Sequence, residues 1–137
     1  MAERPRPRRG LLDTSVVIDL ELIGIDALPE EVAICAITMA ELAAGPHATT
    51  DADERARRQD RLQRTEAAFD PLPFTTEAAR AYGRVFASVA AAGRRPRGAR
   101  AVDLLIAATA LAEGLPLFTR NPEDFSHLNG IVEVVRL

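Results

Sequence analysis

The stretch that decides the fold is Gly10-Leu11-Leu12-Asp13-Thr14-Ser15, where a short apolar run ends at an acid followed by two hydroxyl residues. The apolar run predicts a first strand over residues 10–13, which places Asp13 at the end of that strand. Apolar residues recur at helical spacing immediately afterwards, so residues 14–22 are expected to form a helix. The chain therefore opens with a strand, an acid at its end, and a helix.

The same alternation of short apolar runs and helical stretches continues outward from this segment. Further strands are expected at residues 32–37, 71–74, 117–119 and 131–135, and further helices at residues 38–44, 51–69, 77–92 and 101–113. Pro71 and Pro73 would put the third strand at a sheet edge, because proline cannot donate a ladder hydrogen bond. The alternation predicts a three-layer α/β fold, with a largely parallel five-stranded sheet flanked by helices.

Length and composition indicate a single domain. The chain has 137 residues, of which 47% are hydrophobic, which is enough to bury a core. We expect residues 10–137 to form that domain and residues 1–9, rich in arginine and proline, to form a flexible basic arm. No apolar run reaches the ~18 residues needed to span a membrane, and no secretory signal is recognisable. The single cysteine, Cys35, cannot form an internal disulfide, which fits a cytoplasmic protein.

Four acids fall where a parallel sheet would bring them to one edge, and ligands of such sheets lie beyond the carboxyl ends of the strands. Asp13 directly follows the first strand, Glu41 lies in the first turn of the helix after the second, and Asp124 lies in the loop after the fourth. The helix that contains Asp103 must run back along the sheet to reach the fourth strand, so its first turn lies at the same edge. Topology therefore gathers these four carboxylates on one rim.

Each of these acids also has a purely structural explanation. Asp13 fits the N-cap of the first helix, and Glu41 fits a capping box in which Thr38 is the cap. Asp103 suits the positive end of its helix, and Asp124 suits a turn. Taken singly, each of these acids is explained better by its structural role than by a functional one.

Together, the four acids favour a metal site. Asp103 is the only charge in the apolar run 101–112, and Asp13 is wedged between two apolar pairs. Carboxylates in such surroundings are costly unless they are paired or bind a cation. Hard carboxylate oxygens suit Mg²⁺, with Mn²⁺ as a substitute, better than Zn²⁺. The cysteine and the two histidines, His47 and His127, lack the spacing of a zinc motif.

Four motifs, in order, resemble those of the PIN-domain family over nearly the whole chain. The first is Leu11-Leu12-Asp13-Thr14-Ser15, and the second is Thr38-Met39-Ala40-Glu41-Leu42. The third is Ala101-Val102-Asp103-Leu104-Leu105-Ile106-Ala107-Ala108, and the fourth is Thr119-Arg120-Asn121-Pro122-Glu123-Asp124-Phe125. No single motif is specific, but four in this order and spacing indicate the family. The short length is similar to that of the VapC-type toxins of bacterial and archaeal toxin–antitoxin pairs.

The resemblance implies an endoribonuclease that hydrolyses RNA phosphodiester bonds with Mg²⁺ or Mn²⁺ and leaves 5′-phosphate and 3′-hydroxyl ends. It also implies a homodimer that a small antitoxin holds inactive within a larger complex. Carried over by position, the acidic quartet that would do the chemistry is Asp13, Glu41, Asp103 and Asp124.

Within this implied site, Asp13 and Asp103 would hold the principal metal ion. Glu41 and Asp124 would orient or activate water, or help to hold a second ion. Some family members carry the fourth acid where this chain has Asn121, so that both Asn121 and Asp124 are candidates for the position. Two hydroxyl groups would help to order the site, those of Ser15 and Thr119.

Arginine supplies every basic side chain, because the sequence contains no lysine. RNA contacts are expected from a loop before the helix at residues 101–113, which carries Arg94, Arg95, Arg97 and Arg100. A solvated surface loop is the alternative for this segment. The helix at 51–69 mixes basic with acidic side chains, and a salt-bridged, solvated face is expected for its Arg55, Arg57, Arg58, Arg61 and Arg64.

Other classes of protein fit less well. A haloacid dehalogenase-type phosphatase needs a second acid two residues after the first, where this chain has Ser15. No glycine-rich phosphate loop follows the first strand, and a response-regulator receiver needs a lysine. The remaining alternative is a catalytically inactive binding module of the same fold, which cleavage assays of Asp13→Asn would distinguish from an enzyme.

Overall fold

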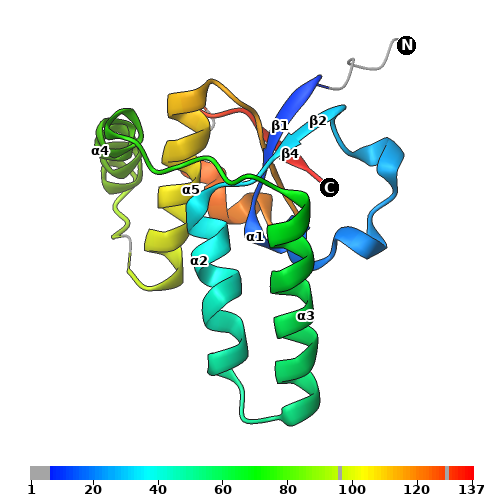
Figure 1. Cartoon of the computed structure of the whole chain (residues 1–137). Coiled ribbons are helices and arrows are strands. Elements are labelled where there is room, and N and C mark those ends of the chain that lie inside the picture. Colours follow the sequence, from blue (N-terminus) through cyan, green and yellow to red (C-terminus); the bar gives the residue numbers. More distant parts are fainter. Residues whose placement is uncertain (1–6, 96, 129) are drawn as a thin grey trace.

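Short parallel strands form the centre of the structure, a computed structural model that describes residues 7–95, 97–128 and 130–137 (Figure 1). They are β1 (Arg9–Leu12), β2 (Glu31–Ala33), β3 (Leu117–Thr119) and β4 (Val134–Arg136). They pair in the order β2-β1-β3-β4, and Leu11 lies opposite both Ala33 and Leu117. Because every strand runs in the same direction, their carboxyl ends share one edge of the sheet.

The third strand, expected at residues 71–74, is wrong, since this segment contributes only a single bridge between Leu72 and Cys35. Leu72 donates its N–H to the carbonyl of Ile34 at 2.9 Å and accepts the N–H of Ala36 at 2.8 Å. The residue on each side of Leu72 is a proline, which has no N–H to continue the ladder. The sheet in the described residues therefore has four strands.

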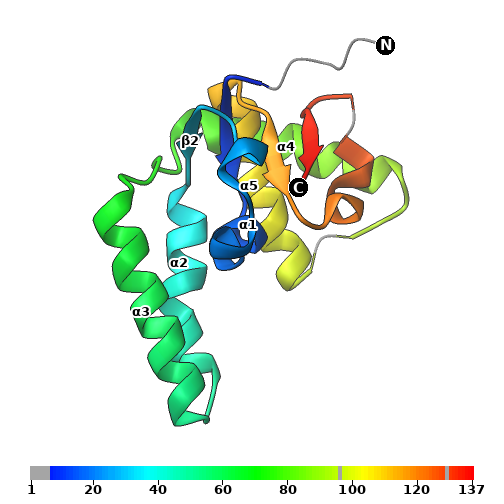
Figure 2. The ribbon, with the colours of Figure 1, turned by 90° about the vertical axis from the view of Figure 1, so that its right-hand side faces the viewer.

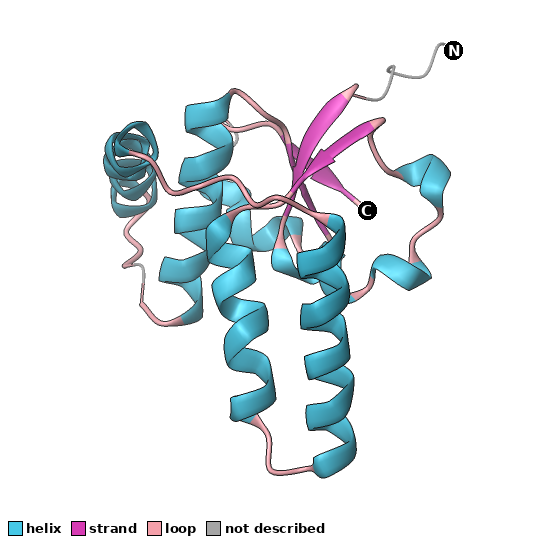
Figure 3. Ribbon diagram, in the orientation of Figure 1, coloured by secondary structure: helices cyan, strands magenta, loops and turns pink. Residues whose placement is uncertain are grey.

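Helices cover both faces of the sheet (Figure 3). The α-helices are α1 (Thr14–Ile18), α2 (Ala36–Ala44), α3 (Ala52–Ala68), α4 (Thr76–Ala91) and α5 (Ala99–Glu113). Short 3-10 helices complete the chain, namely η1 (Leu20–Leu22), η2 (Ile25–Ala27), η3 (Gly45–Ala48) and η4 (Pro122–Leu128). The helix expected at 14–22 is thus split into α1 and η1, and α2 and α5 each begin two residues earlier than expected.

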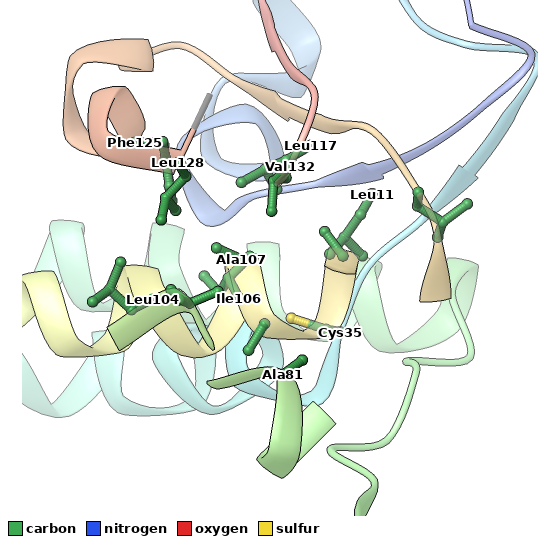
Figure 4. Close-up of a cluster of buried hydrophobic side chains, with 14 of the residues drawn as sticks. Leu11, Cys35, Ala81, Leu104, Ile106, Ala107, Leu117, Phe125, Leu128 and Val132 are labelled. Atoms are coloured by element: carbon green, nitrogen blue, oxygen red, sulfur yellow. The ribbon is translucent and has the colours of Figure 1, made fainter. Parts of the chain in front are cut away.

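The sheet buries side chains on both faces, because successive residues of a strand point to opposite sides. Leu11 and Leu117 belong to a buried cluster with α4, α5 and η4. Figure 4 shows this cluster, in which Leu104 of α5 faces Phe125 and Leu128 of η4, while Ala107 lies below Leu117 of β3. The next residue in each strand, Leu12 in β1 and Phe118 in β3, belongs to a second buried cluster with residues of α1 and α2. The result is a three-layer α/β/α arrangement.

Helices α2 and α3 lie side by side and project away from the sheet (Figures 1 and 2). Side chains of α3 fix the connection between them. Arg58 donates to the carbonyl of Gly45 at 2.9 Å, and Arg55 donates to the carbonyls of Pro46 and Thr49 at 3.1 and 3.0 Å. These hydrogen bonds hold the α2–α3 pair in a fixed arrangement beside the carboxyl edge of the sheet.

Residues 1–6 of the expected basic arm lie outside the described residues, and Arg9 already belongs to β1. Over the ranges that the structure covers, no helix combines the length and the apolar character needed to cross a membrane.

Gly10 stands where the chain has no room for a side chain. A Cβ at this position would meet the ring of Phe118 well inside van der Waals contact and would also touch Pro29 at 3.1 Å. We expect Gly10→Ala to lower the free energy of unfolding by roughly 1–3 kcal/mol through overpacking.

The matched control is Gly83→Ala in α4, where a Cβ would meet nothing within 4 Å. That change should raise stability by about 0.5–1 kcal/mol, because alanine favours a helix more than glycine does. Urea unfolding of both variants measures the difference, and equal stabilities would mean that the ring of Phe118 moves aside freely.

Candidate metal centre at the carboxyl edge

Asp103 lies at the meeting point of the predicted acids. Burial raises the pKa of this carboxyl to about 7, and the negative charges of Asp124, Glu41 and Asp13, in that order of size, act in the same direction. Arg100 acts in the opposite direction. The charges of the other three predicted acids therefore reach Asp103, so all four lie in the same region at the carboxyl edge of the sheet.

Asp13 follows β1 directly and is buried, with 5% of its surface exposed. Its Oδ1 accepts the hydroxyl of Ser15 at 2.6 Å and the N–H of Val16 at 3.1 Å, so Asp13 is also the N-cap of α1. Within the described residues, Oδ2 accepts no hydrogen bond. The structural and the functional interpretations of Asp13 are therefore compatible, since one oxygen fixes the side chain and the other is available to a ligand.

Two hydroxyl groups join the end of β1 to the end of β3. The oxygen of Ser15 accepts the N–H of Arg120 at 3.1 Å, and that of Thr119 accepts the N–H of Asn121 at 3.0 Å. The two oxygens are 3.4 Å apart, and because Ser15 directs its proton at Asp13, Thr119 is the donor between them. This network fixes both Asp13 and the start of the loop that leads to η4.

Glu41 is held by a residue that the sequence reasoning missed. The hydroxyl of Thr14 donates to Glu41 Oε1 at 2.6 Å and also lies 3.2 Å from the hydroxyl of Thr38. The expected capping box is wrong, because α2 begins at Ala36 with Cys35 as its N-cap, which puts Thr38 inside the helix and Glu41 in the second turn. The signal that could have found Thr14 is its position, one residue after an acid at a strand end.

For the RNA cleavage that the family resemblance implies, removal of the Thr14 hydroxyl is expected to lower the rate. A hydrogen bond to a charged group contributes about 1.5–3 kcal/mol, so Thr14→Val should reduce kcat by roughly 10- to 100-fold while Thr14→Ser restores it. Single-turnover cleavage measures the effect. Thr109→Val is the control, since that hydroxyl only binds the carbonyl of Leu105 within α5, and an equal loss in both variants would indicate a general defect.

Asp103 and Asp124 complete the rim from two other elements. Asp103 is half-buried in the second turn of α5, not in the first turn as expected, because α5 begins at Ala99. Asp124 is exposed in η4, where its N–H binds the carbonyl of Asn121 at 3.0 Å. Asp124, unlike Asn121, carries the charge that acts on Asp103.

The donor set fits a hard divalent cation. The free donor atoms are carboxylate oxygens, and their mutual repulsion is expressed in the raised pKa of Asp103. Within the described ranges, no three or more acidic, histidine or cysteine side chains lie close enough together to hold a metal ion. Mg²⁺ does not require such a group, because it commonly binds one or two carboxylates and takes its other ligands from water and substrate phosphates.

Three of the predicted RNA-binding arginines precede α5, and Arg100 lies in its first turn. Arg94, Arg95 and Arg97 are exposed, whereas Arg100 is half-buried and its charge reaches Asp103. Pro96 of this loop lies outside the described residues. Fold and site together define a parallel α/β protein with an acidic, oxygen-rich centre at the carboxyl edge of its sheet.

The chain belongs to the PIN domain family, whose model matches residues 10–131. Ribonuclease VapC5 of Mycobacterium tuberculosis (strain ATCC 25618 / H37Rv) is 38% identical over 136 residues, which cover 96% of this chain and 97% of that protein. Ribonuclease VapC8 of the same species (strain CDC 1551 / Oshkosh) is 42% identical over 102 residues, which cover 74% and 89%. Among solved structures, VapBC-5 of M. tuberculosis, a member of the VapBC family of toxin–antitoxin systems, aligns with a TM-score of 0.80 and 37% identity, covering 96% and 100%.

Proposed function

We propose that this chain is a VapC-type endoribonuclease toxin that uses Mg²⁺, or Mn²⁺ in its place, to hydrolyse RNA phosphodiester bonds. The observation that carries the proposal is the convergence of Asp13, Glu41 and Asp124 on the half-buried Asp103. A carboxyl whose pKa is raised by burial and by three like charges is relieved when a cation binds. The relatives named ribonuclease, at 38% and 42% identity, support the reaction class.

Each acid has a distinct part in this proposal. Asp13 and Asp103 would hold the metal ion, Asp13 through the oxygen that the Ser15 hydroxyl leaves available. Glu41, fixed at one oxygen by Thr14, would orient the attacking water with the other. The bound ion would supply positive charge for the developing phosphorane and lower the pKa of its water. Asp124, the exposed member, would complete the rim beside the incoming strand.

The partners in this proposal are an RNA substrate, a small antitoxin and a second copy of the chain, all in the cytoplasm. The solved relative VapBC-5 is named as a toxin–antitoxin member, which supports an antitoxin partner here. An arginine-bearing antitoxin tail would satisfy the acidic rim without a metal, because guanidinium pairs with carboxylate in a bidentate manner.

The test is cleavage of a labelled single-stranded RNA by the wild type and by two neighbouring variants of η4. We expect Mg²⁺-dependent cleavage that EDTA stops and that Asp124→Asn reduces at least ~10-fold, by analogy with the loss of an acid–base group. Glu123→Gln is the control, since Glu123 is also exposed but is not among the main causes of the raised pKa of Asp103.

A binding module of the same fold is the competing function. It predicts Mg²⁺-independent RNA or antitoxin binding with no cleavage by the wild type, and no difference between Asp13→Asn and the wild type in any assay of RNA integrity. Cleavage by the wild type that is lost in Asp13→Asn excludes it.

A further inference from the structure

The arginines of α3 differ in the partners that they bind. Arg57 and Arg58 pair with Glu54, and Arg64 pairs with Glu21 and Asp60. Arg55, described above, donates to backbone carbonyls. The salt-bridged, solvated face expected from the sequence thus describes much of the helix but not Arg61. Throughout the described residues, the guanidinium of Arg61 makes no hydrogen bond and no ion pair, although its side chain is half-buried.

Arg61 lines two hollows that lie along the inner side of α3. The first has a volume of about 290 Å³ and includes Thr14 and Glu41 in its wall. The second, of about 390 Å³, runs between α1 and α3 as far as Phe69. Ile18 and Arg61 belong to both walls, so the two hollows adjoin along α3. We call the two adjoining hollows the α1–α3 groove, and the smaller of them reaches Glu41.

We propose that the α1–α3 groove binds the RNA strand next to the cleaved bond, with Arg61 contacting a backbone phosphate. This inference rests on the function proposed above, because the groove reaches Glu41 of the acidic rim. The guanidinium nitrogens of Arg61 have no partner and remain accessible, since His127 Nε2 is the only buried side-chain N or O atom without a partner in the described residues. A phosphate that enters the groove could therefore pair with this guanidinium in a bidentate manner. The exposed side chain of Ile18, at 44% exposure, offers an apolar surface to a ribose or base.

Most charged side chains of the α1–α3 groove are already paired, and Arg61 is the arginine that remains available to a ligand. The acids in the groove are already paired, Glu54 with two arginines, and Glu21 and Asp60 with Arg64. The exception is Glu41, the acid assigned above to the cleavage site. Arg58 is also engaged, through Glu54 and the carbonyl of Gly45. A phosphate that enters the groove therefore meets one unmatched positive charge, close to the proposed site of cleavage.

Binding is tested separately from cleavage in the Asp103→Asn background, which keeps the RNA intact. The affinity of a fluorescein-labelled 12-nucleotide single-stranded RNA is measured by anisotropy with Mg²⁺ at several salt concentrations. We expect Arg61→Gln to weaken binding by about 5- to 10-fold and to reduce the salt slope by about 0.7, the value for one phosphate contact on a single strand. In the active background, KM should rise with kcat nearly unchanged.

Arg64→Gln is the matched control, since Arg64 lies one turn away and is already paired with acids. It should change RNA affinity less than about twofold, as expected for an exposed ion pair. Arg61→Lys keeps the charge and should retain part of the affinity. Thermal unfolding of each variant shows whether the fold is intact.

Equal RNA affinity and salt slope for Arg61→Gln and Arg64→Gln would overturn the assignment. A loss of affinity for a hexaglutamate peptide, with RNA binding unchanged, would also overturn it and would mark the groove as a site for an acidic protein segment. If RNA binding depends on Arg61 but the wild type cleaves no RNA, the groove assignment stands and the catalytic function fails.

Discussion

Asp103→Asn is expected to abolish RNA cleavage and, in the absence of metal, to make the protein harder to unfold above neutral pH. The loss of one of the two proposed principal metal ligands should reduce both Mg²⁺ affinity and cleavage rate by on the order of 10³-fold, which corresponds to about 4 kcal/mol. The gain in stability follows from the pKa of Asp103, which is about 7 in the folded protein against an ordinary value of 3.8.

The direction of that gain follows from proton binding. Between pH 3.8 and about 7, the folded protein retains a proton on Asp103 that the unfolded chain has released. The free energy of unfolding therefore falls as the pH rises through this window, and it stays lowered above it. Asparagine has no proton to lose, so the variant escapes this destabilisation.

Calorimetry with Mg²⁺ in calcium-free buffer, together with thermal unfolding at pH 8 in EDTA, measures both effects. Glu113→Gln, at the exposed far end of α5, is the control and should resemble the wild type in both experiments. Mg²⁺ binding that is equal in Asp103→Asn and the wild type would show that Asp103 is not a ligand. A lower Tm for the variant than for the wild type in EDTA would show that the folded protein accommodates the charged carboxylate of Asp103 without a cost in stability.

Mg²⁺ affinity is expected to fall steeply on acidification. A metal ligand must be ionised, and the pKa of Asp103 before metal binds is about 7. Below that pH, Mg²⁺ competes with a proton, so its Kd should increase about tenfold per pH unit and about 100-fold by pH 5. The stabilisation that added Mg²⁺ provides at pH 8 should accordingly shrink at pH 5.

Isothermal titration from pH 8 to pH 5 measures the dependence, and the protons released on binding can be counted by repeating it in buffers of different ionisation enthalpy. A carbon-detected NMR titration of the aspartate carboxyls gives the pKa of Asp103 directly. A Kd that changes less than about threefold over this range would mean that Asp103 is ionised well below neutral pH or does not bind the ion.

Much of the fold followed from the alternation of apolar runs and helical stretches. The three-layer parallel architecture is confirmed, because runs such as 10–13 and 117–119 are too short and too apolar to be anything but buried strands. The errors lie at boundaries and at the sheet edge, where tertiary hydrogen bonds decide. The sequence of Leu72 and its proline neighbours could not show that only one residue would pair.

The placement of the acids at the carboxyl edge could be predicted from the sequence. The hydrogen bonds that fix their side chains could not. Topology alone brought Asp13, Glu41 and Asp103 to one edge, because it requires only the strand order and the direction of α5. Hydrogen bonds that join distant segments were not predictable, and Thr14 reaches Glu41 across 27 positions of sequence. The lack of a partner for Arg61 among the described residues could not be predicted either, since it depends on which acids the neighbouring arginines bind.

The proline-flanked bridge at Leu72 has a consequence for how this chain can associate with others. An exposed edge strand invites the strand of another molecule to add to the sheet, and such addition leads readily to aggregation. Here Leu72 occupies the hydrogen-bonding groups of Ile34 and Ala36, at the end of β2, while the prolines beside it offer no N–H groups outward. Growth of the sheet is blocked along this stretch, so a partner that approaches there has to recognise side chains instead of backbone.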